Sequence, residues 1–289
     1  MTVATTTGTA ALEPAPGGRK RFARSIQWRH PALALLTALV VFYLVFPLLV
    51  TIPISFNSIQ RIEFPPTGYS TRWYANFLGI GEENRNSRWL SATWLSVRIA
   101  LATSVLSTVL GGLAAIPVAR AQFRGKNLVQ TLLLLPLVLP VIVLAVGLFL
   151  MYVPLRLLGS PMGIVFGHSV LAIPYVTIIV AATLKNFDER LEWAAMSLGA
   201  NRTRTLLSVT IPIVRPGIIA GALFAFITSF DELLIALFVS GARAVTLPRL
   251  LWDFVRSEAS PVIAVVSVLL TVFSIVAVGL VATVQRERR

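Results

Sequence analysis

Two adjacent carboxylates, Asp231 and Glu232, interrupt an apolar run that extends from Gly217 to Ala242. An ionised acid is costly in hydrocarbon, so such a residue normally faces a water-filled path or a partner charge inside a helix bundle. Two chemistries fit a pair of this kind, namely attraction of a cationic solute and transfer of a proton. Because adjacent residues diverge by about 100° around a helix, the two side chains cannot face the same way.

The first chemistry predicts a substrate path around the acid pair. Thr228 lies one helical turn before the pair, and Phe224 or Phe230 supplies an aromatic face for a cation. The alternative is a buried acid that pairs with an internal arginine such as Arg98 and holds two helices together. The sequence leaves both roles open. The predicted path comprises Asp231, Glu232, Phe224, Thr228 and Phe230.

Little else in the chain suggests catalysis or a cofactor. There is no cysteine, and the two histidines, His30 and His168, are isolated, so no disulfide and no metal site are predicted. His168 lies in an apolar run, where a hydrogen-bonded structural role is favoured over a proton relay. Gly125-Lys126 is followed by asparagine and lacks the upstream glycine of a P-loop, which excludes a nucleotide site there. We therefore predict neither an enzyme nor a bound cofactor.

The composition predicts an all-α membrane protein. Apolar residues make up 56% of the chain and charged residues 13%, with a mean hydropathy of +0.81, whereas soluble domains carry about a quarter charged residues. A membrane-spanning helix needs roughly 20 apolar residues. Six such helices are predicted, over about Pro31–Phe56, Leu90–Ala119, Leu128–Met151, Val165–Leu184, Ile213–Val239 and Pro261–Val284.

The distribution of positive charge predicts the orientation. With a cytosolic N-terminus and six spans, the inner segments hold fifteen Lys and Arg residues and the outer segments eight. This bias follows the positive-inside rule and places both termini in the cytosol of a bacterial cell, with the chain crossing the inner (plasma) membrane several times. The net charge of +13 does not indicate nucleic-acid binding, because no soluble face displays it.

A polar, basic segment between two apolar runs is the strongest functional signal. It begins at Glu192 and reads EWAAMSLGANRTRTLLSVTIPIVRPG. Asn186 or Asp188 is a suitable N-cap for a helix that continues to Leu198, and Gly199 permits that helix to end. A second short helix is predicted from Arg202 to Val209, ending before Pro212. We therefore expect a helix, a glycine turn and another helix outside the membrane.

Such a segment has the properties of a rigid connector to a partner protein. Ala194 and Ala195 are small enough to enter a groove, while Glu192, Arg202 and Arg204 supply charges that fix its register. An ordinary amphipathic loop on the membrane face is the simpler alternative. The location between apolar runs, on the predicted inner side, favours the connector.

The segment resembles the EAA loop of ABC-importer permeases. The matching residues are Glu192, Ala194, Ala195, Gly199 and Pro212. Further pieces are similar to the second permease subunit of the spermidine/putrescine branch: Phe226, Ser229, Phe230-Asp231-Glu232, Val239-Ser-Gly241, Thr246-Leu-Pro248, Ser260-Pro261 and the segment Phe64–Tyr74. Trp193 and Ile211 depart from the usual residues of that branch.

The resemblance implies a type I ABC importer permease fold with a cytosolic coupling helix. It implies coupling to an ATPase through Glu192, Ala194, Ala195, Gly199, Arg202 and Pro212. The expected partners are a second, different permease subunit, two cytosolic ATP-binding subunits, a periplasmic or extracellular solute-binding protein and the lipid bilayer. The chain would form half of the path for a small cationic or amino solute, with a polyamine such as spermidine or putrescine favoured.

Composition and the resemblance together divide the chain. Residues 1–29 are expected to be a disordered basic cytosolic tail, 30–89 the first transmembrane helix and an outer loop, 90–285 an ABC transmembrane type-1 permease domain, and 286–289 a basic cytosolic tail. The alternative function is a stand-alone proton-coupled secondary carrier or membrane enzyme that uses Asp231, Glu232 and His168. That alternative leaves the EAA-like segment unexplained.

Overall fold

The structure is a computed structural model of the 289-residue chain and describes residues 31–81, 87–257 and 260–286. Of the predicted basic tails, residues 1–29 lie outside the described chain, as do residues 287–289. Side chains in the last helix are described as far as Ile275.

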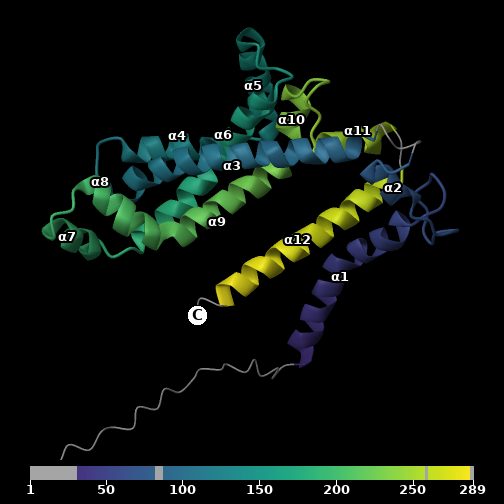
Figure 1. Ribbon diagram of the computed structural model, residues 1–289, viewed down its shortest axis with the longest axis horizontal. Helices are drawn as coiled ribbons and strands as arrows, with labels where there is room; N and C mark the ends of the chain where they lie inside the picture. Colours follow the sequence, from purple (N-terminus) through teal and green to yellow (C-terminus); the bar gives the residue numbers. More distant parts are fainter. Residues whose placement is uncertain (1–30, 82–86, 258–259, 287–289) are drawn as a thin grey trace, which may run out of the picture. The chain divides into compact units, whose positions relative to one another are not determined.

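The described chain is helical, as the composition predicts (Figure 1). An isolated bridge between Asn57 and Tyr69 is its one β-type pairing among these residues. The helices are α1 Pro31–Ser55, α2 Arg72–Leu78, α3 Arg88–Arg120, α4 Lys126–Val138, α5 Val141–Leu155, α6 Pro161–Lys185, α7 Arg190–Ser197, α8 Arg202–Thr205, α9 Ile211–Phe230, α10 Leu234–Val239, α11 Leu247–Ser257 and α12 Val262–Arg286. A π-helical turn, Leu206–Thr210, joins α8 to α9.

Internal contacts divide the chain into two units, Met1–Pro47 and Leu48–Arg289. The described part of the first unit is the beginning of α1, whose apolar side chains are exposed apart from the half-buried Ala34. Exposed apolar surface of this kind suits a helix whose surroundings are lipid or another subunit, because lipid tails are as apolar as leucine. The second unit contains the packed core.

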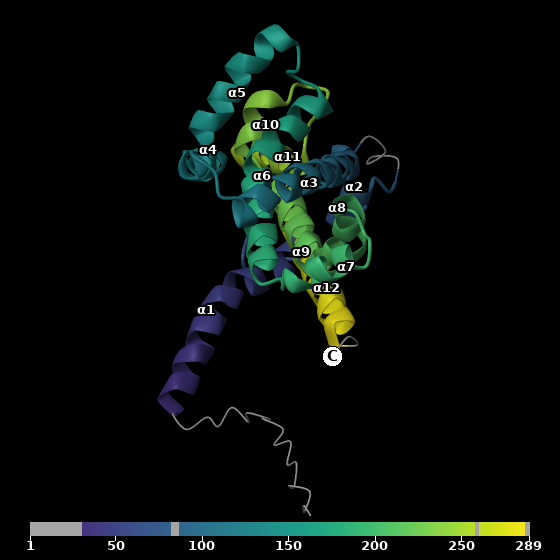
Figure 2. The ribbon, with the colours of Figure 1, turned by 90° about the vertical axis from the view of Figure 1, so that its left-hand side faces the viewer.

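Helices α3, α6 and α9 form that core and pack side by side (Figure 2). Small residues permit the close approach: Gly111 of α3 and Gly221 of α9 both face Val176 of α6. Hydroxyl groups add hydrogen bonds between helices. Ser104 Oγ donates to the Ala222 carbonyl at 2.7 Å, and Thr177 Oγ1 donates to the Gly111 carbonyl at 3.2 Å. Such contacts are typical of membrane helices, which lack a hydrophobic driving force for association.

Gly111 and Gly112 offer a matched test of this packing. A Cβ atom on Gly111 would lie 2.8 Å from Val176 Cβ and 2.9 Å from the Ile173 carbonyl oxygen, whereas one on Gly112 would meet nothing within 4 Å. We expect Gly111→Ala to lower the free energy of unfolding by about 1–3 kcal/mol through overpacking. Gly112→Ala should leave it unchanged or raise it by up to ~1 kcal/mol, because alanine favours a helix.

Thermal unfolding of the two variants in the same detergent measures the difference. Equal shifts in melting temperature would contradict the close contact between α3 and α6.

Four helical segments of the described chain are long and apolar enough to cross a membrane: α1, α3, α6 and the continuous segment Arg202–Phe230. The pair α4–α5 makes a fifth if its two helices form one crossing. The sixth predicted span coincides with α12, whose described side chains form a shorter apolar stretch, Val262–Ile275. The count of six therefore stays a prediction.

The single helix predicted over Leu128–Met151 is in fact two helices. The axes of α4 and α5 differ by 101°. Leu139, between them, has an extended backbone (φ −72°, ψ 140°), as expected for a residue that precedes proline. Pro140 also has no N–H with which to continue the helix. Pro136, in contrast, lies within α4 without ending it.

The helix predicted over Ile213–Val239 is also divided, so the acid pair does not lie inside a helix. Helix α9 ends at Phe230, and α10 begins at Leu234. Glu232 Oε1 accepts a hydrogen bond from the Ile235 N–H at 2.8 Å and so satisfies a free donor in the first turn of α10. The carboxylate thus favours the start of a new helix at a place where the apolar pattern predicted one continuous helix.

At its other end, α9 is longer than predicted. The short helix expected from Arg202 to Val209 does not stop before Pro212 but continues through the π-helical turn into α9. Pro212 lies in the first turn of α9, where a missing N–H is tolerated.

Candidate functional site

The polar segment between α6 and α9 is attached to the bundle by an ion pair. Arg120, the last residue of α3, donates from Nη1 to both carboxylate oxygens of Glu192, at 2.8 and 2.9 Å. The two side chains are only 21% and 17% exposed. A charge-assisted pair shielded in this way is stronger than one on an open surface. It joins α7 to the end of a helix that crosses the bundle.

Other groups complete the contact around Arg120. Thr210 donates its hydroxyl to Glu192 Oε1, which joins α7 to the π-helical turn before α9. Glu189 Oε1 lies 3.9 Å from Arg120 Nε, and the guanidinium carbon is 5.4 Å from the centre of the Phe187 ring. Arg120 and Glu192 together therefore connect the end of α3, the first turn of α7 and the entry to α9.

The turn between α7 and α8 has the geometry that the sequence predicts. Gly199 has a φ of +89°, which favours glycine. Its N–H donates to the Met196 carbonyl at 3.0 Å, and the Ala200 N–H donates to the Ala195 carbonyl at 3.1 Å. This is the Schellman pattern of a helix end. Asn201 Oδ1 then accepts from the Arg204 N–H at 2.8 Å and caps α8.

Helix α7 turns an apolar edge outward. Leu191 is 46% exposed, Trp193 60% and Leu198 90%. Ala194 is exposed as well, and it lies on the same side of the helix as Leu191 and Leu198, whereas Trp193 lies on another side. Arg202 and Arg204 are exposed just beyond the turn. Apolar side chains exposed on a short polar segment are a feature of surfaces that bind another protein or the membrane. We call Leu191, Trp193, Ala194 and Leu198 the α7 edge.

The structure places the predicted coupling residues in different surroundings. Ala194 and Arg202 face outward, whereas the Glu192 side chain faces inward to Arg120 and is not a charge at the rim. Ala195 is half-buried, Gly199 forms the turn, and Pro212 lies in the first turn of α9. Sequence reasoning missed Arg120 and Thr210 as partners of Glu192. Arg120 could have been noticed in the sequence, because it is a cation at the end of an apolar run.

The predicted substrate-path residues lie at the other end of α9. Asp231 is exposed at the break before α10, and Phe224, 45% exposed, lies two turns earlier, with its ring centre 4.9 Å from that of Tyr175. Thr228 between them is half-buried. Phe230 instead stacks on Phe226 at 5.9 Å and packs beside the cluster that contains Leu247 and Val266.

The remaining polar groups near this end have structural partners. His168 is 1% exposed, and its Nδ1 lies 2.8 Å from Ser229 Oγ across α6 and α9. Glu232 caps α10. Among the described residues, no ion pair joins Arg98 to either acid, and no group of His, Asp and Glu side chains could hold a metal ion.

The comparisons with known proteins agree with these features. Residues 107–289 match the family described as the inner membrane component of binding-protein-dependent transport systems. The chain belongs to this family. Putrescine transport system permease protein PotI of Escherichia coli (strain K12) is 35% identical over 235 residues, which cover 79% of this chain and 81% of that protein. The permease is therefore a multi-pass inner membrane protein of a transport family.

Two further comparisons extend the likeness. Spermidine/putrescine transport system permease protein PotC of the same strain is 30% identical over 249 residues, 85% of this permease and 90% of that protein. The crystal structure of a bacterial ABC transporter involved in the import of the acidic polysaccharide alginate has a TM-score of 0.56 at 17% identity. That likeness covers 92% of this chain and 98% of the other and supports the importer-permease fold.

Proposed function

We propose that this permease forms half of the translocation path of an ATP-driven importer and that α7 is its coupling helix. The observation that carries the proposal is the α7 edge, an exposed apolar surface on a short helix that an ion pair fixes to the bundle. A partner that binds the edge would move α7 as a unit, because Glu192 and the turn at Gly199 hold its two ends.

Two routes lead from α7 into the bundle. The bond from Arg120 to Glu192 leads into α3, and the bond from Thr210 to the same carboxylate leads into α9. Both helices pack on α6. A displacement of α7 by a cytosolic ATPase would therefore act on two core helices together, which suits alternation between inward-facing and outward-facing openings.

The importer would contain two permeases, two ATP-binding subunits and an external solute-binding protein, with this chain's termini in the cytosol. Within it, residues 90–285 are assigned as the permease domain. The named relatives support a polyamine as the solute. The proton-coupled alternative gains no support, because His168 and Glu232 have local structural partners.

Cysteine cross-linking tests the coupling proposal directly, because the natural chain has no cysteine. Ala194→Cys places one thiol on the α7 edge, and Leu78→Cys places one on α2, where Leu78 is 47% exposed. In the assembled complex, a short bifunctional maleimide should join position 194, but not position 78, to a cysteine introduced in the ATP-binding subunit. Labelling of position 194 by an impermeant reagent in intact cells would contradict a cytosolic α7.

Asp231 offers a test of the solute path. We expect Asp231→Asn to raise KM for putrescine uptake about two- to fivefold, since an exposed charge contributes up to ~1 kcal/mol to attraction of a cation. Glu232→Gln is the matched control. It should leave KM unchanged and lower the melting temperature instead, because that carboxylate caps α10. Unchanged uptake kinetics in Asp231→Asn would remove this residue from the path.

A further inference from the structure

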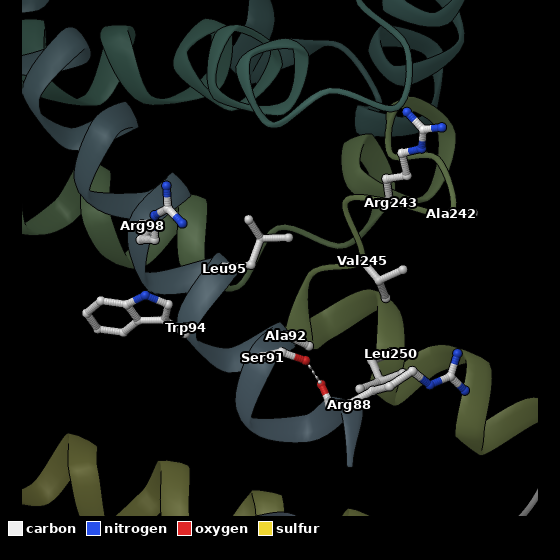
Figure 3. Close-up of a pocket in the computed structure, with 10 residues that line it drawn as sticks. All are labelled: Arg88, Ser91, Ala92, Trp94, Leu95, Arg98, Ala242, Arg243, Val245 and Leu250. Carbon is white, nitrogen blue, oxygen red and sulfur yellow. Dashed lines mark hydrogen bonds between the residues drawn. The ribbon is translucent and has the colours of Figure 1, made fainter. Parts of the chain in front are cut away.

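A pocket of about 400 Å³ opens between the first three turns of α3 and the segment formed by the loop before α11 and the start of α11 (Figure 3). Its residues come from two segments far apart in sequence, Arg88–Arg98 and Ala242–Leu250. The proposed coupling segment and the acid pair contribute nothing to its described lining. The pocket is therefore distinct from both sites discussed above.

The pocket combines apolar walls with a cationic rim. Ala92, Leu95, Val245 and Leu250 form its apolar part. Arg88, Arg98 and Arg243 complete the lining, and all three are exposed. Figure 3 shows Arg98 and Arg243 on opposite sides of the pocket, with Leu95 and Val245 between them.

These arginines have no counter-charge among the described residues. The ion pairs of that part of the chain involve Arg120 and Arg249, and no acid belongs to the described lining of this pocket. Guanidinium groups stay charged at any physiological pH and bind carboxylate or phosphate through paired N–H donors. Arg88 also begins α3, so the N-terminal end of a 33-residue helix adds positive potential.

We propose that this pocket binds an amphipathic anion, that is, a phosphate or carboxylate group attached to an apolar portion. The rim takes the anionic group, and the walls formed by Leu95 and Val245 take the apolar portion. A polyamine is disfavoured here, because its charge has the same sign as the rim. The inference rests on the membrane location of the chain and does not depend on the proposed coupling to an ATPase.

Two sources supply such an anion, an anionic phospholipid and a free solute. Trp94, which also lines the pocket, is 62% exposed on a helix long enough to cross the membrane. Tryptophan gathers at the level of the lipid headgroups. A lipid phosphate is therefore available at the depth where the arginines lie.

The lipid source is tested on the full-length permease, purified with its partner subunits in mild detergent. Phosphatidylglycerol or phosphatidylcholine is added, and native mass spectrometry counts the lipids retained. We expect preferential retention of phosphatidylglycerol that falls at least about fivefold in Arg98→Gln/Arg243→Gln and weakens with salt. The double variant with lysine at both positions should lose less, because lysine keeps the charge but not the paired donors.

A matched control removes two positive charges elsewhere. Arg61 and Arg156 are exposed and lie outside the pocket, so Arg61→Gln/Arg156→Gln should retain phosphatidylglycerol as the natural protein does. An equal loss in this control would overturn the proposal, since it would show attraction by net charge alone. Melting temperatures of the variants, measured in parallel, identify any that fail to fold.

The soluble source is tested with inorganic phosphate in nanodiscs of neutral lipid. Binding should change the fluorescence of Trp94. The Trp94 signal is obtained by subtracting the fluorescence change of Trp94→Phe from that of the natural protein. If the fluorescence response to phosphate requires Arg98 and Arg243 but phosphatidylglycerol is not preferentially retained, the pocket is an anion site whose ligand is a soluble solute. If neither phosphatidylglycerol retention nor the phosphate response depends on these arginines in folded variants, the pocket is not an anion site.

Discussion

Arg120→Glu should reduce coupled solute uptake by at least about tenfold in a complex that still assembles. The substitution removes the two hydrogen bonds to Glu192 and places two carboxylates where one ion pair stands. Loss of one partner costs about 3–5 kcal/mol for a fully buried pair. Because these side chains keep about a fifth of their exposure, we expect the contact between α3 and α7 to lose about 1.5–3 kcal/mol. A loss of ~1.4 kcal/mol already lowers the population of the fixed arrangement tenfold.

The measurement is the ratio of solute transported to ATP hydrolysed in proteoliposomes. A positioning role predicts that this ratio falls while ATP hydrolysis persists, since α7 stays present but is no longer fixed to α3. Arg124→Glu is the matched control, because Arg124 is exposed on the same turn after α3 and should keep the natural ratio.

The exchange Arg120→Glu/Glu192→Arg separates pairing from simple loss of structure. It restores opposite charges across the same contact, so part of the coupling should return. Recovery will be incomplete, because Glu189 lies 3.9 Å from the present guanidinium and would then face a like charge. No recovery at all, together with a natural melting temperature, would show that the ion pair does not transmit the movement.

Local features of the coupling segment could be predicted because they depend on nearby atoms. A glycine at the end of a helix-forming stretch adopts positive φ without a side-chain clash, and the structure has that geometry at Gly199. Of the two caps predicted for α7, Asp188 accepts a hydrogen bond from the Arg190 N–H at 3.0 Å just before the helix, whereas Asn186 ends α6 and Glu189 occupies the N-cap position itself. The membrane location could also be predicted, because a long apolar run is stable mainly as a membrane-spanning helix.

Contacts between distant segments could not be predicted in the same way. Arg120 and Glu192 are 72 residues apart, and their pairing depends on how α3 and α6 pack. The charge of Glu192 indicated a role in docking but not the direction of its side chain. The pocket lined by Arg98 and Arg243 likewise exists only because the loop before α11 folds beside α3.

Helix breaks form an intermediate case. Pro136 and Pro140 are four residues apart in one apolar run, yet only the second coincides with a break. Neighbouring helices in a membrane can compensate for a missing N–H, so a proline alone does not fix the outcome. At Glu232, the break reflects a carboxylate that caps the following helix, which apolar periodicity does not detect.

Leu198→Asp should prevent stable association with the ATP-binding subunits while the permease itself stays folded. Leu198 is 90% exposed, so the permease alone loses almost no packing when the side chain changes. If a partner groove covers the α7 edge, a charge there would be desolvated without a counter-charge. Substitution of a residue at the centre of an interface weakens the binding free energy by about 2 kcal/mol or more, which lowers the affinity roughly thirtyfold.

The test is co-purification of the ATP-binding subunits with the variant, together with its melting temperature. Leu78→Asp on α2 is the control, since it introduces the same charge at an exposed leucine away from α7 and should retain the ATPase. Leu78 is less exposed than Leu198, at 47% against 90%, so the melting temperature of each variant is needed to separate lost packing from lost docking. Normal ATPase recovery with Leu198→Asp would mean that the α7 edge is not the docking surface, and the exposed apolar side chains of α7 would then need a different partner.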